Sequence, residues 1–204
     1  MARPQSVNDE DLLDRLAAVF RARGFTGASL AELSAASGLK RASLYHRFPG
    51  GKEQMAHEVL AAAADWLERE VITPLTGSAS PAARLEAVGS ALDGFYDGGA
   101  QACLLNMLSS ARVENGPFSA DIGGMFARLI EALARLGEDA GLGSEEARCR
   151  AERAVMLIQG ALVLARGCGD RAPFRRMLAA LPEVILGTDA LPPSEALAPG
   201  RAGA

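Results

Sequence analysis

Residues 24–53 read GFTGASLAELSAASGLKRASLYHRFPGGKE, and the rest of the chain can be organised around this segment. Ser29 is followed three positions later by Glu32, which is the spacing of a capping box. In such a box each side chain satisfies a free backbone amide at the start of a helix. Gly38 can adopt the positive φ that ends a helix. The pattern therefore predicts a short helix over residues 29–37.

A second short helix is predicted directly after this turn, over residues 40–48. Leu44 and Phe48 are four positions apart, so both side chains face the same side of that helix, as Leu39 does. Two short helices joined at a glycine form a helix-turn-helix, whose second helix can lie in the major groove of DNA. The outward side chains of the second helix are the candidate DNA contacts. They are Lys40, Arg41, Ala42, Ser43, Tyr45 and His46.

Several of these side chains have the chemistry that DNA contacts need. The Arg41 guanidinium can bind O6 and N7 of guanine, while Tyr45 and His46 can donate to phosphate oxygens. Lys52 follows a glycine pair at the start of another helix, where free backbone amides already favour an anion. Ser29 completes the set of expected DNA contacts. The alternative is an amphipathic helix whose basic face is only solvated.

Charge is distributed unevenly along the chain. The whole chain has a formal net charge of −4, but the segment from Arg21 to Lys52 carries +5, so the remainder carries −9. The basic residues of this segment are Arg21, Arg23, Lys40, Arg41, Arg47 and Lys52, against the single acid Glu32. This asymmetry favours a polyanion as the partner of the segment and predicts an acidic, solvated remainder.

Residues 9–58 resemble the amino-terminal signature of the TetR family of transcriptional regulators. The resemblance rests on Gly24-Phe25, the capping box, the Tyr-His-Arg-Phe run at 45–48 and the following Pro-Gly-Gly-Lys-Glu, which is similar to the LmrA/YxaF-type branch. It implies an all-helical homodimer whose three amino-terminal helices bind an operator. It also implies a carboxyl-terminal domain that holds an inducing ligand, so the expected function is a ligand-responsive repressor.

Two residues depart from the family pattern in the second of the short helices. Lys40 stands where many relatives have a small capping residue, and Ala42 stands where many have glycine. The helix is therefore expected to lack a side-chain cap, and the operator sequence cannot be transferred from a relative.

The rest of the chain is also predicted to be helical, which makes the protein all-α. Ala and Leu far outnumber the β-branched residues that strands favour. Further helices are expected at about 9–23, 52–74, 82–97, 101–114, 118–140, 145–167 and 172–186. The expected division is a DNA-binding domain over 1–58, a ligand-binding and dimerisation domain over 59–187, and a disordered tail over 188–204 rich in Pro, Ala and Gly.

The helix over 145–167 is apolar around most of its circumference between Ala154 and Ala165, so one core contact would not cover it. Together with the last helix it resembles the pair that forms the four-helix dimer interface of the TetR family. A homodimer through these two helices is therefore expected. The alternative is the ordinary core of a monomer.

A small hydrophobic or aromatic ligand is expected in the carboxyl-terminal domain. Large or adaptable apolar side chains that could surround a cavity, with polar ones to orient a ligand, are candidates. They are Trp66, Phe95, Tyr96, Cys103, Met107, Phe126 and Met156, with Asn106, Arg112 and Gln159 as polar contacts. The alternative for each of them is a place in the core.

Other classes of function find little support in the sequence. The histidines are His46 and His57, HExxH, GxSxG and GxGxxG motifs do not occur, and the three cysteines form no CxxC pair. We therefore expect no enzyme, cofactor or metal site, and cysteines that are reduced and mostly buried.

No apolar run reaches the roughly 20 residues of a membrane span, and no secretory signal begins the sequence, so a cytoplasmic protein is expected. A protein-binding adaptor remains a further alternative.

Overall fold

The structure is a computed structural model that describes residues 8–109 and 116–187. Its elements are α1 (Asp9–Gly27), α2 (Leu30–Ser37), α3 (Arg41–Arg47), α4 (Gly51–Leu67), the π-helical turn η1 (Glu68–Ile72), α5 (Thr73–Leu75), α6 (Pro81–Phe95), the 3-10 turn η2 (Asp97–Gly99), α7 (Leu104–Ser109), α8 (Ser119–Asp139), α9 (Ser144–Cys168) and α10 (Ala172–Leu186). The described residues contain no strand, so the predicted all-α class is confirmed. None of these helices is long and apolar enough to cross a membrane.

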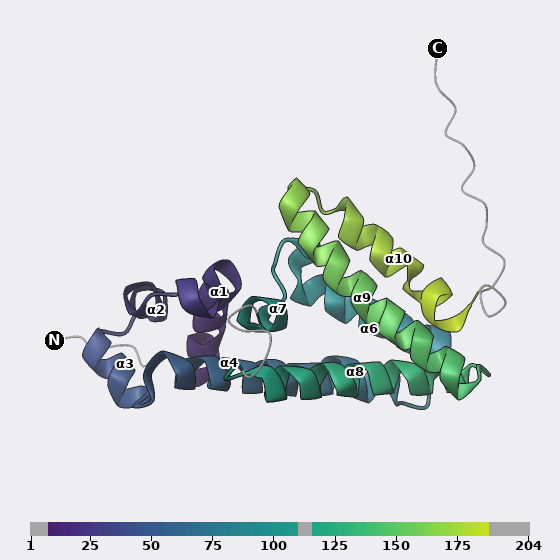
Figure 1. Cartoon of the computed structure of the whole chain (residues 1–204), viewed down its shortest axis with the longest axis horizontal. Helices are drawn as coiled ribbons and strands as arrows, with labels where there is room; N and C mark the ends of the chain where they lie inside the picture. The colour runs from purple at the N-terminus through teal and green to yellow at the C-terminus, as the bar shows by residue number, and fades with distance from the viewer. Residues whose placement is uncertain (1–7, 110–115, 188–204) are drawn as a thin grey trace, which may run out of the picture.

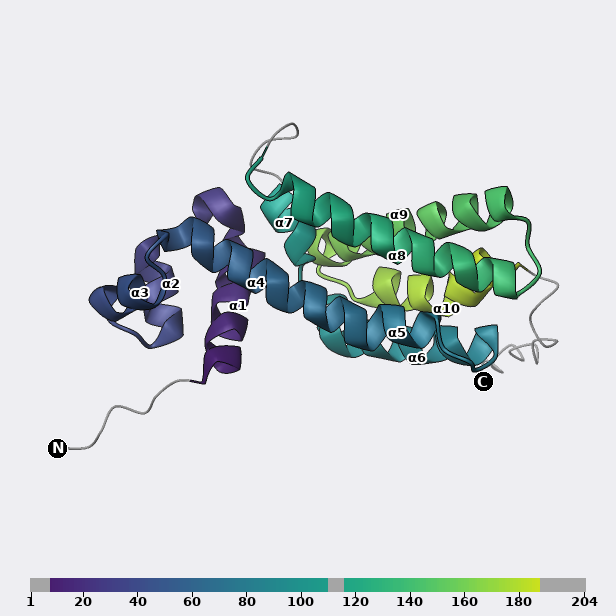
Figure 2. The ribbon, with the colours of Figure 1, turned by 90° about the horizontal axis from the view of Figure 1, so that it is seen from below.

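The helices form a small head and a longer body (Figure 1). The head consists of α1, α2, α3 and residues 51–60 of α4, and the body is formed by the elements that follow. α4 leaves the head and continues through η1 into α5, so one rod from Gly51 to Leu75 runs from the head along the body (Figure 2). A displacement of this rod would therefore affect both the head and the body.

The head is held together by apolar side chains from all of its helices. Phe20, Leu33, Leu44 and Phe48 are fully buried in one cluster, and each such burial contributes roughly 1.5–3 kcal/mol. The same cluster also takes in side chains of the body helices α7 and α8, namely Leu104, Leu108, Phe118, Ile122 and Met125. The head therefore rests on the body through a shared core.

Two helix boundaries differ from the sequence prediction because of glycines. The first helix is expected to end at about residue 23. Gly24 does break the helical path with φ 68° and ψ 178°, but one further turn follows to Gly27. The helix expected from residue 101 begins only at Leu104, after η2. In η2, a Cβ at Gly99 would lie 2.6 Å from Phe174, so only glycine allows this close approach to α10. Residues 110–114 of that expected helix lie outside the described part of the chain.

The helix expected as one piece over 52–74 contains the π-helical turn η1. Val71 of this turn and Leu75 of α5 are fully buried in the body core. π-turns inside α-helices are uncommon and occur frequently at functional sites. This one lies beside the cavity described below.

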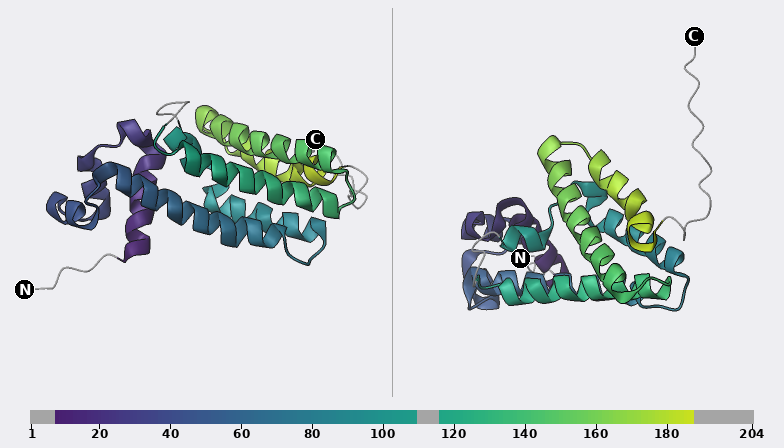
Figure 3. Two further views of the ribbon diagram at one scale, coloured as in Figure 1. Left: turned by 60° about the horizontal axis from the view of Figure 1, so that its bottom comes forward. Right: turned by 45° about the vertical axis from the view of Figure 1, so that its right-hand side comes forward.

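The body is built from α6, α8, α9 and α10, which pack side by side (Figure 3). Arg84 of α6 is buried and donates to the Asp139 carboxylate and to the Leu75 carbonyl, each at 2.8 Å, so it ties α6 to α8 and α5. The expected division of the chain near residue 58 stays a prediction, and the expected tail over 188–204 lies outside the described residues.

Candidate functional site

The turn between α2 and α3 is held by hydrogen bonds between side chains and backbone. The Ser29 hydroxyl accepts from the Glu32 amide at 3.2 Å, and Glu32 accepts from the Ser29 amide at 3.0 Å, so the predicted capping box is confirmed. Gly38 ends α2 with φ 71°, as predicted. The Ser34 hydroxyl also donates to the Leu39 carbonyl at 2.6 Å. These contacts fix the start of α3 relative to α2.

α3 has a buried face and an exposed face. Leu44 and Phe48 are buried and Leu39 is half-buried, as their spacing predicts. The residues expected to contact DNA from this helix are all exposed: Lys40, Arg41, Ala42, Ser43, Tyr45 and His46. Lys40 stands at the N-cap without a side-chain capping bond, as expected from the departure noted above. The exposed face of α3 therefore brings together six of the eight predicted DNA contacts.

Four of the six cations in the basic segment, Arg21, Arg23, Arg47 and Lys52, are engaged within the protein. Arg23 and Arg47 each pair with a glutamate, at 3.0 Å and 2.9 Å respectively. Arg21 turns toward the body, as described below. By contrast, the side chains of Lys40 and Arg41 make no hydrogen bond or ion pair with any other described residue. The charge available at the surface of the head is therefore concentrated at the start of α3.

Lys52 is bound to the loop that precedes α2. Its Nζ donates to the Ala28 carbonyl at 3.1 Å and lies 4.7 Å from the centre of the Phe25 ring. The Tyr45 ring lies beside the neighbouring residue, since a Cβ at Gly51 would be 3.7 Å from it. An ammonium group has three donors, so two remain for another partner. Ser29, the last of the predicted contacts, is exposed, but its hydroxyl serves the capping box.

Arg15 is an exposed cation near this surface that the sequence does not predict as a DNA contact. The Arg15 guanidinium, from α1, lies 3.6 Å from the position that a Cβ at Gly38 would take, so it borders the turn between α2 and α3. The basic segment in the sequence begins only at Arg21, and helix periodicity alone does not indicate which side of α1 faces that turn.

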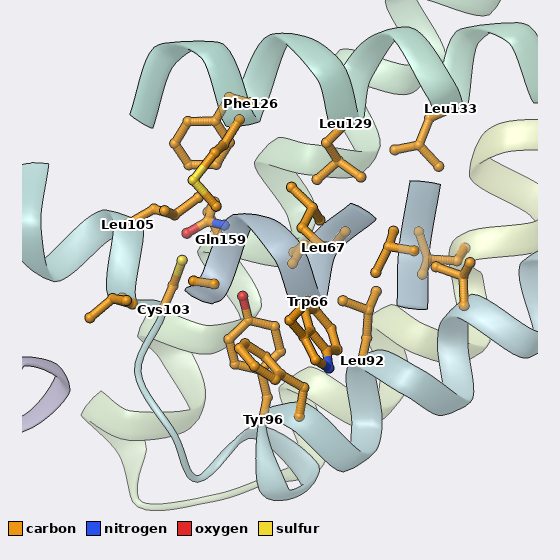
Figure 4. A pocket seen from close by; sticks show the side chains of 18 of the residues that line it. Trp66, Leu67, Leu92, Tyr96, Cys103, Leu105, Phe126, Leu129, Leu133 and Gln159 are labelled. Carbon is orange, nitrogen blue, oxygen red and sulfur yellow. The ribbon is translucent and has the colours of Figure 1, made fainter. Parts of the chain in front are cut away.

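A cavity of about 50 Å³ lies inside the body between α4, α6, α7, α8, α9 and α10 (Figure 4). Six of the predicted ligand contacts line it: Trp66, Phe95, Tyr96, Cys103, Phe126 and Gln159. Met107 and Asn106 do not line it, and Arg112 lies outside the described residues. Met156 is 66% exposed, because it stands two positions before Ile158 and so points away from the cavity side of α9.

Aromatic rings form one wall of the cavity. Trp66 and Phe95 stack with their ring centres 3.7 Å apart. On the outer side, the Arg21 guanidinium lies 4.7 Å from the centre of the Phe95 ring and donates to Gln101 at 2.8 Å. Burial lowers the pKa of Arg21. α1 of the head therefore contacts the cavity wall directly, which the sequence analysis did not predict.

The outer face of α9 is apolar and exposed. Among the described residues, four of the five large apolar side chains that are exposed lie on it: Met156, Leu157, Val163 and Leu164. Their spacing of seven places them on one stripe of the helix. The stripe, which we call the α9 stripe, is an unpartnered surface in the single chain.

The fold and this site can now be compared with known proteins. Residues 12–59 match the family described as bacterial regulatory proteins, tetR family. The HTH-type transcriptional regulator LmrA of Bacillus subtilis is 30% identical over 78 residues, which cover 38% of this chain and 42% of LmrA. The HTH-type transcriptional repressor KstR2 of Mycobacterium tuberculosis is 33% identical over 76 residues, which cover 37% of this chain and 38% of KstR2. The alignments thus span less than half of either relative.

Solved structures extend the comparison to the body. A TetR transcriptional regulator from Legionella pneumophila has a TM-score of 0.77 at 22% identity, over 90% of this chain and 100% of that chain, which is a likeness of fold. The TetR family regulator CifR, solved as a cysteine variant with double-stranded operator DNA of 26 base pairs, has a TM-score of 0.64 at 25% identity, over 90% of this chain and 98% of that chain. Both of these proteins are described as transcriptional regulators. Residues 12–59 therefore correspond to the tetR family of bacterial regulatory proteins, and the described residues share the fold of TetR-family regulators.

Proposed function

We propose that the protein is a homodimeric repressor that binds a palindromic operator through α3 and releases it when a small hydrophobic ligand occupies the cavity. The exposed face of α3 carries this proposal, because it combines unpaired cations with small side chains that allow close approach to DNA. In this proposal Arg41 and Ser43 contact bases, while Lys40, Tyr45, His46 and Lys52 contact phosphates. The DNA complex of CifR and the name of the repressor KstR2 support it.

Arg15 is added to the phosphate contacts, and Ser29 is given a structural role. Arg15 borders the α2–α3 turn, and its charge is exposed there. The Ser29 hydroxyl already accepts from one backbone amide and donates to Glu32. We therefore expect Ser29 to hold α2 in place and to affect DNA binding through the position of α3.

A second copy of the chain supplies the other reading head. One α3 can contact only a few base pairs, whereas a dimer with its two heads about 34–36 Å apart would contact both halves of a palindromic site. The α9 stripe supports this arrangement because it is apolar and exposed. It belongs to the body, whereas the DNA-facing helix α3 belongs to the head.

The ligand would act by widening the cavity. Sites for drug-sized ligands usually have volumes of about 300–1,000 Å³, whereas this cavity has about 50 Å³. A ligand must therefore push the walls apart, and two of these walls are Trp66 and Leu67 of α4. Since α4 begins at Gly51 in the head, its displacement would move the head. A ligand that prefers the wider state would then lower operator affinity by shifting the population of states.

The test is binding of the purified protein to duplexes from the region upstream of its own gene and from neighbouring genes, followed by footprinting. Affinity should fall steeply with salt, and compounds from a hydrophobic panel should release the duplex. Arg41→Ala should weaken discrimination at one base pair by about 1–3 kcal/mol. Arg135→Ala removes the same charge from an exposed position on α8 and should leave discrimination unchanged. Indifference to every duplex at low ionic strength, with salt-insensitive binding of a protein instead, would favour the adaptor.

A further inference from the structure

The cavity contains one buried acceptor that has no partner. The side-chain oxygen Oε1 of Gln159 is inaccessible to solvent and accepts no hydrogen bond from any described residue. Gln159 belongs to α9 and lines the cavity together with apolar side chains from five other α-helices. A buried acceptor without a donor destabilises the state that contains it, because the hydrogen bonds it would make to water are not replaced. A donor from a water or a ligand in the cavity would supply the missing partner.

The polar groups of the cavity gather at one end. In Figure 4 the Gln159 amide, the Cys103 sulfur and the Tyr96 hydroxyl lie together, whereas Leu129 and Leu133 lie toward the opposite end. The cavity is therefore polar at one end and aliphatic at the other. This asymmetry would orient an elongated ligand.

The polar end carries no charge. Among the described residues that line the cavity, none is acidic or basic. Burial raises the pKa of Tyr96 well above its ordinary value, and the neighbouring Cys103 thiol raises it further, so the phenol stays protonated at neutral pH. An ionised ligand would lose its hydration here without gaining a counter-charge from the lining, which is strongly unfavourable.

We infer that the cavity takes an uncharged ligand with an apolar body and one hydrogen-bond donor at its end, a hydroxyl or an N–H, which donates to Oε1 of Gln159. This inference rests on the proposed ligand-binding function and narrows its ligand to a chemical class. A ligand with only an acceptor at that end, such as an ether, would leave Oε1 of Gln159 without a partner. The site should therefore discriminate strongly between a donor and an acceptor of equal size.

The probes are n-octanol and methyl heptyl ether, which are isomers and differ in whether the oxygen carries a hydrogen. Trp66 is the single tryptophan of the chain and lies in the cavity wall, so its fluorescence reports binding, and neither probe absorbs near its band. We expect n-octanol to bind the full-length protein roughly tenfold more tightly than the ether, the size of one hydrogen bond to a buried acceptor. Gln159→Leu and Gln159→Met should reduce this ratio to about one.

Leu133→Met is the matched control, because it conserves volume at the opposite end of the cavity and should leave the ratio unchanged. Circular dichroism identifies the variants that remain folded. Two Gln159 variants are used so that the test can still be made if one of them does not fold. Equal affinities of the two probes in the unaltered protein would overturn the inference and leave the ligand site in place. If neither probe changed Trp66 fluorescence up to its solubility limit, both the inference and the ligand part of the proposed function would be wrong. Operator binding of the same samples tests the remaining part separately.

Discussion

Lys52 is held by the protein and can still reach a phosphate. Its ammonium donates to the Ala28 carbonyl and lies over Phe25, which leaves two donors. Lys52→Ala should therefore lower the free energy of unfolding by about 1–2 kcal/mol. It should also weaken binding to operator and random DNA alike and make the salt dependence shallower, because one phosphate contact is lost. Urea unfolding and affinity measured against salt concentration check the two effects.

Lys40→Ala is the matched control for this prediction. Lys40 is exposed, and its side chain makes no hydrogen bond or ion pair with another described residue. The change should reduce the salt dependence of DNA binding and leave unfolding almost unaffected. If Lys52→Ala lowered stability but left the salt dependence unchanged, Lys52 would have a structural role alone.

Single cations also show what the sequence could not predict. The basic segment was correctly identified, but the sequence does not indicate which of its charges are neutralised. Arg47 pairs with Glu58 of α4, and Arg21 lies over Phe95 of α6. Both partners come from other helices, so only the packing of those helices decides which cations remain free. Lys40 and Arg41 remain free because α3 turns them to solvent.

At the scale of the element, the cap of α2 makes stability depend on pH. Glu32 accepts from the backbone amide and the hydroxyl of Ser29, and these bonds and Arg23 lower the pKa of Glu32. Because the folded state lowers this pKa, the stabilisation is complete above the ordinary glutamate pKa and is lost as pH falls through the lowered value. Glu32→Gln should therefore be less stable than the unaltered protein at neutral pH, and the difference should vanish in acid. Urea unfolding across this pH range measures it.

Glu86→Gln is the matched control, because it makes the same chemical change on α6. Glu86 is exposed, and its side chain makes no hydrogen bond or ion pair with another described residue. Its effect on unfolding should be small at every pH. A pH-independent loss in Glu32→Gln would mean that the side chain stabilises α2 by packing and that its charge is unimportant.

Local signals predicted the elements well where the interactions are local. The capping box and Gly38 act within a few residues, so α2 was correctly predicted from its own sequence. α9 is different, because it is apolar around most of its circumference and its pattern does not indicate which side faces inward. Met156 was therefore assigned to the cavity, although it lies on the exposed side. The turn η1 depends on how the rod from α4 to α5 meets the body, which no local pattern encodes.

At the scale of the whole molecule, the cavity joins residues that are far apart in sequence. Its aromatic lining was predicted because Trp66, Phe95 and Tyr96 are rare, large side chains in this chain. Its aliphatic lining was not, since Leu129 and Leu133 cannot be distinguished from ordinary core leucines by type or spacing. Only the packing of the six α-helices around the cavity determines that these two leucines line it.

In the proposed dimer, the α9 stripe forms the contact between the two copies of the chain. Leu164→Arg places a charge on this apolar surface, where pairing with a second copy would bury it without a partner. The chain should become monomeric in analytical ultracentrifugation, and affinity for a palindromic duplex should fall at least tenfold, because only one head can bind at a time. Ala127→Arg adds the same charge at an exposed position on α8 and should change neither result. A Leu164→Arg protein that remained dimeric and bound the duplex as before would place the interface elsewhere, because an unpaired arginine cannot be buried there at so little cost.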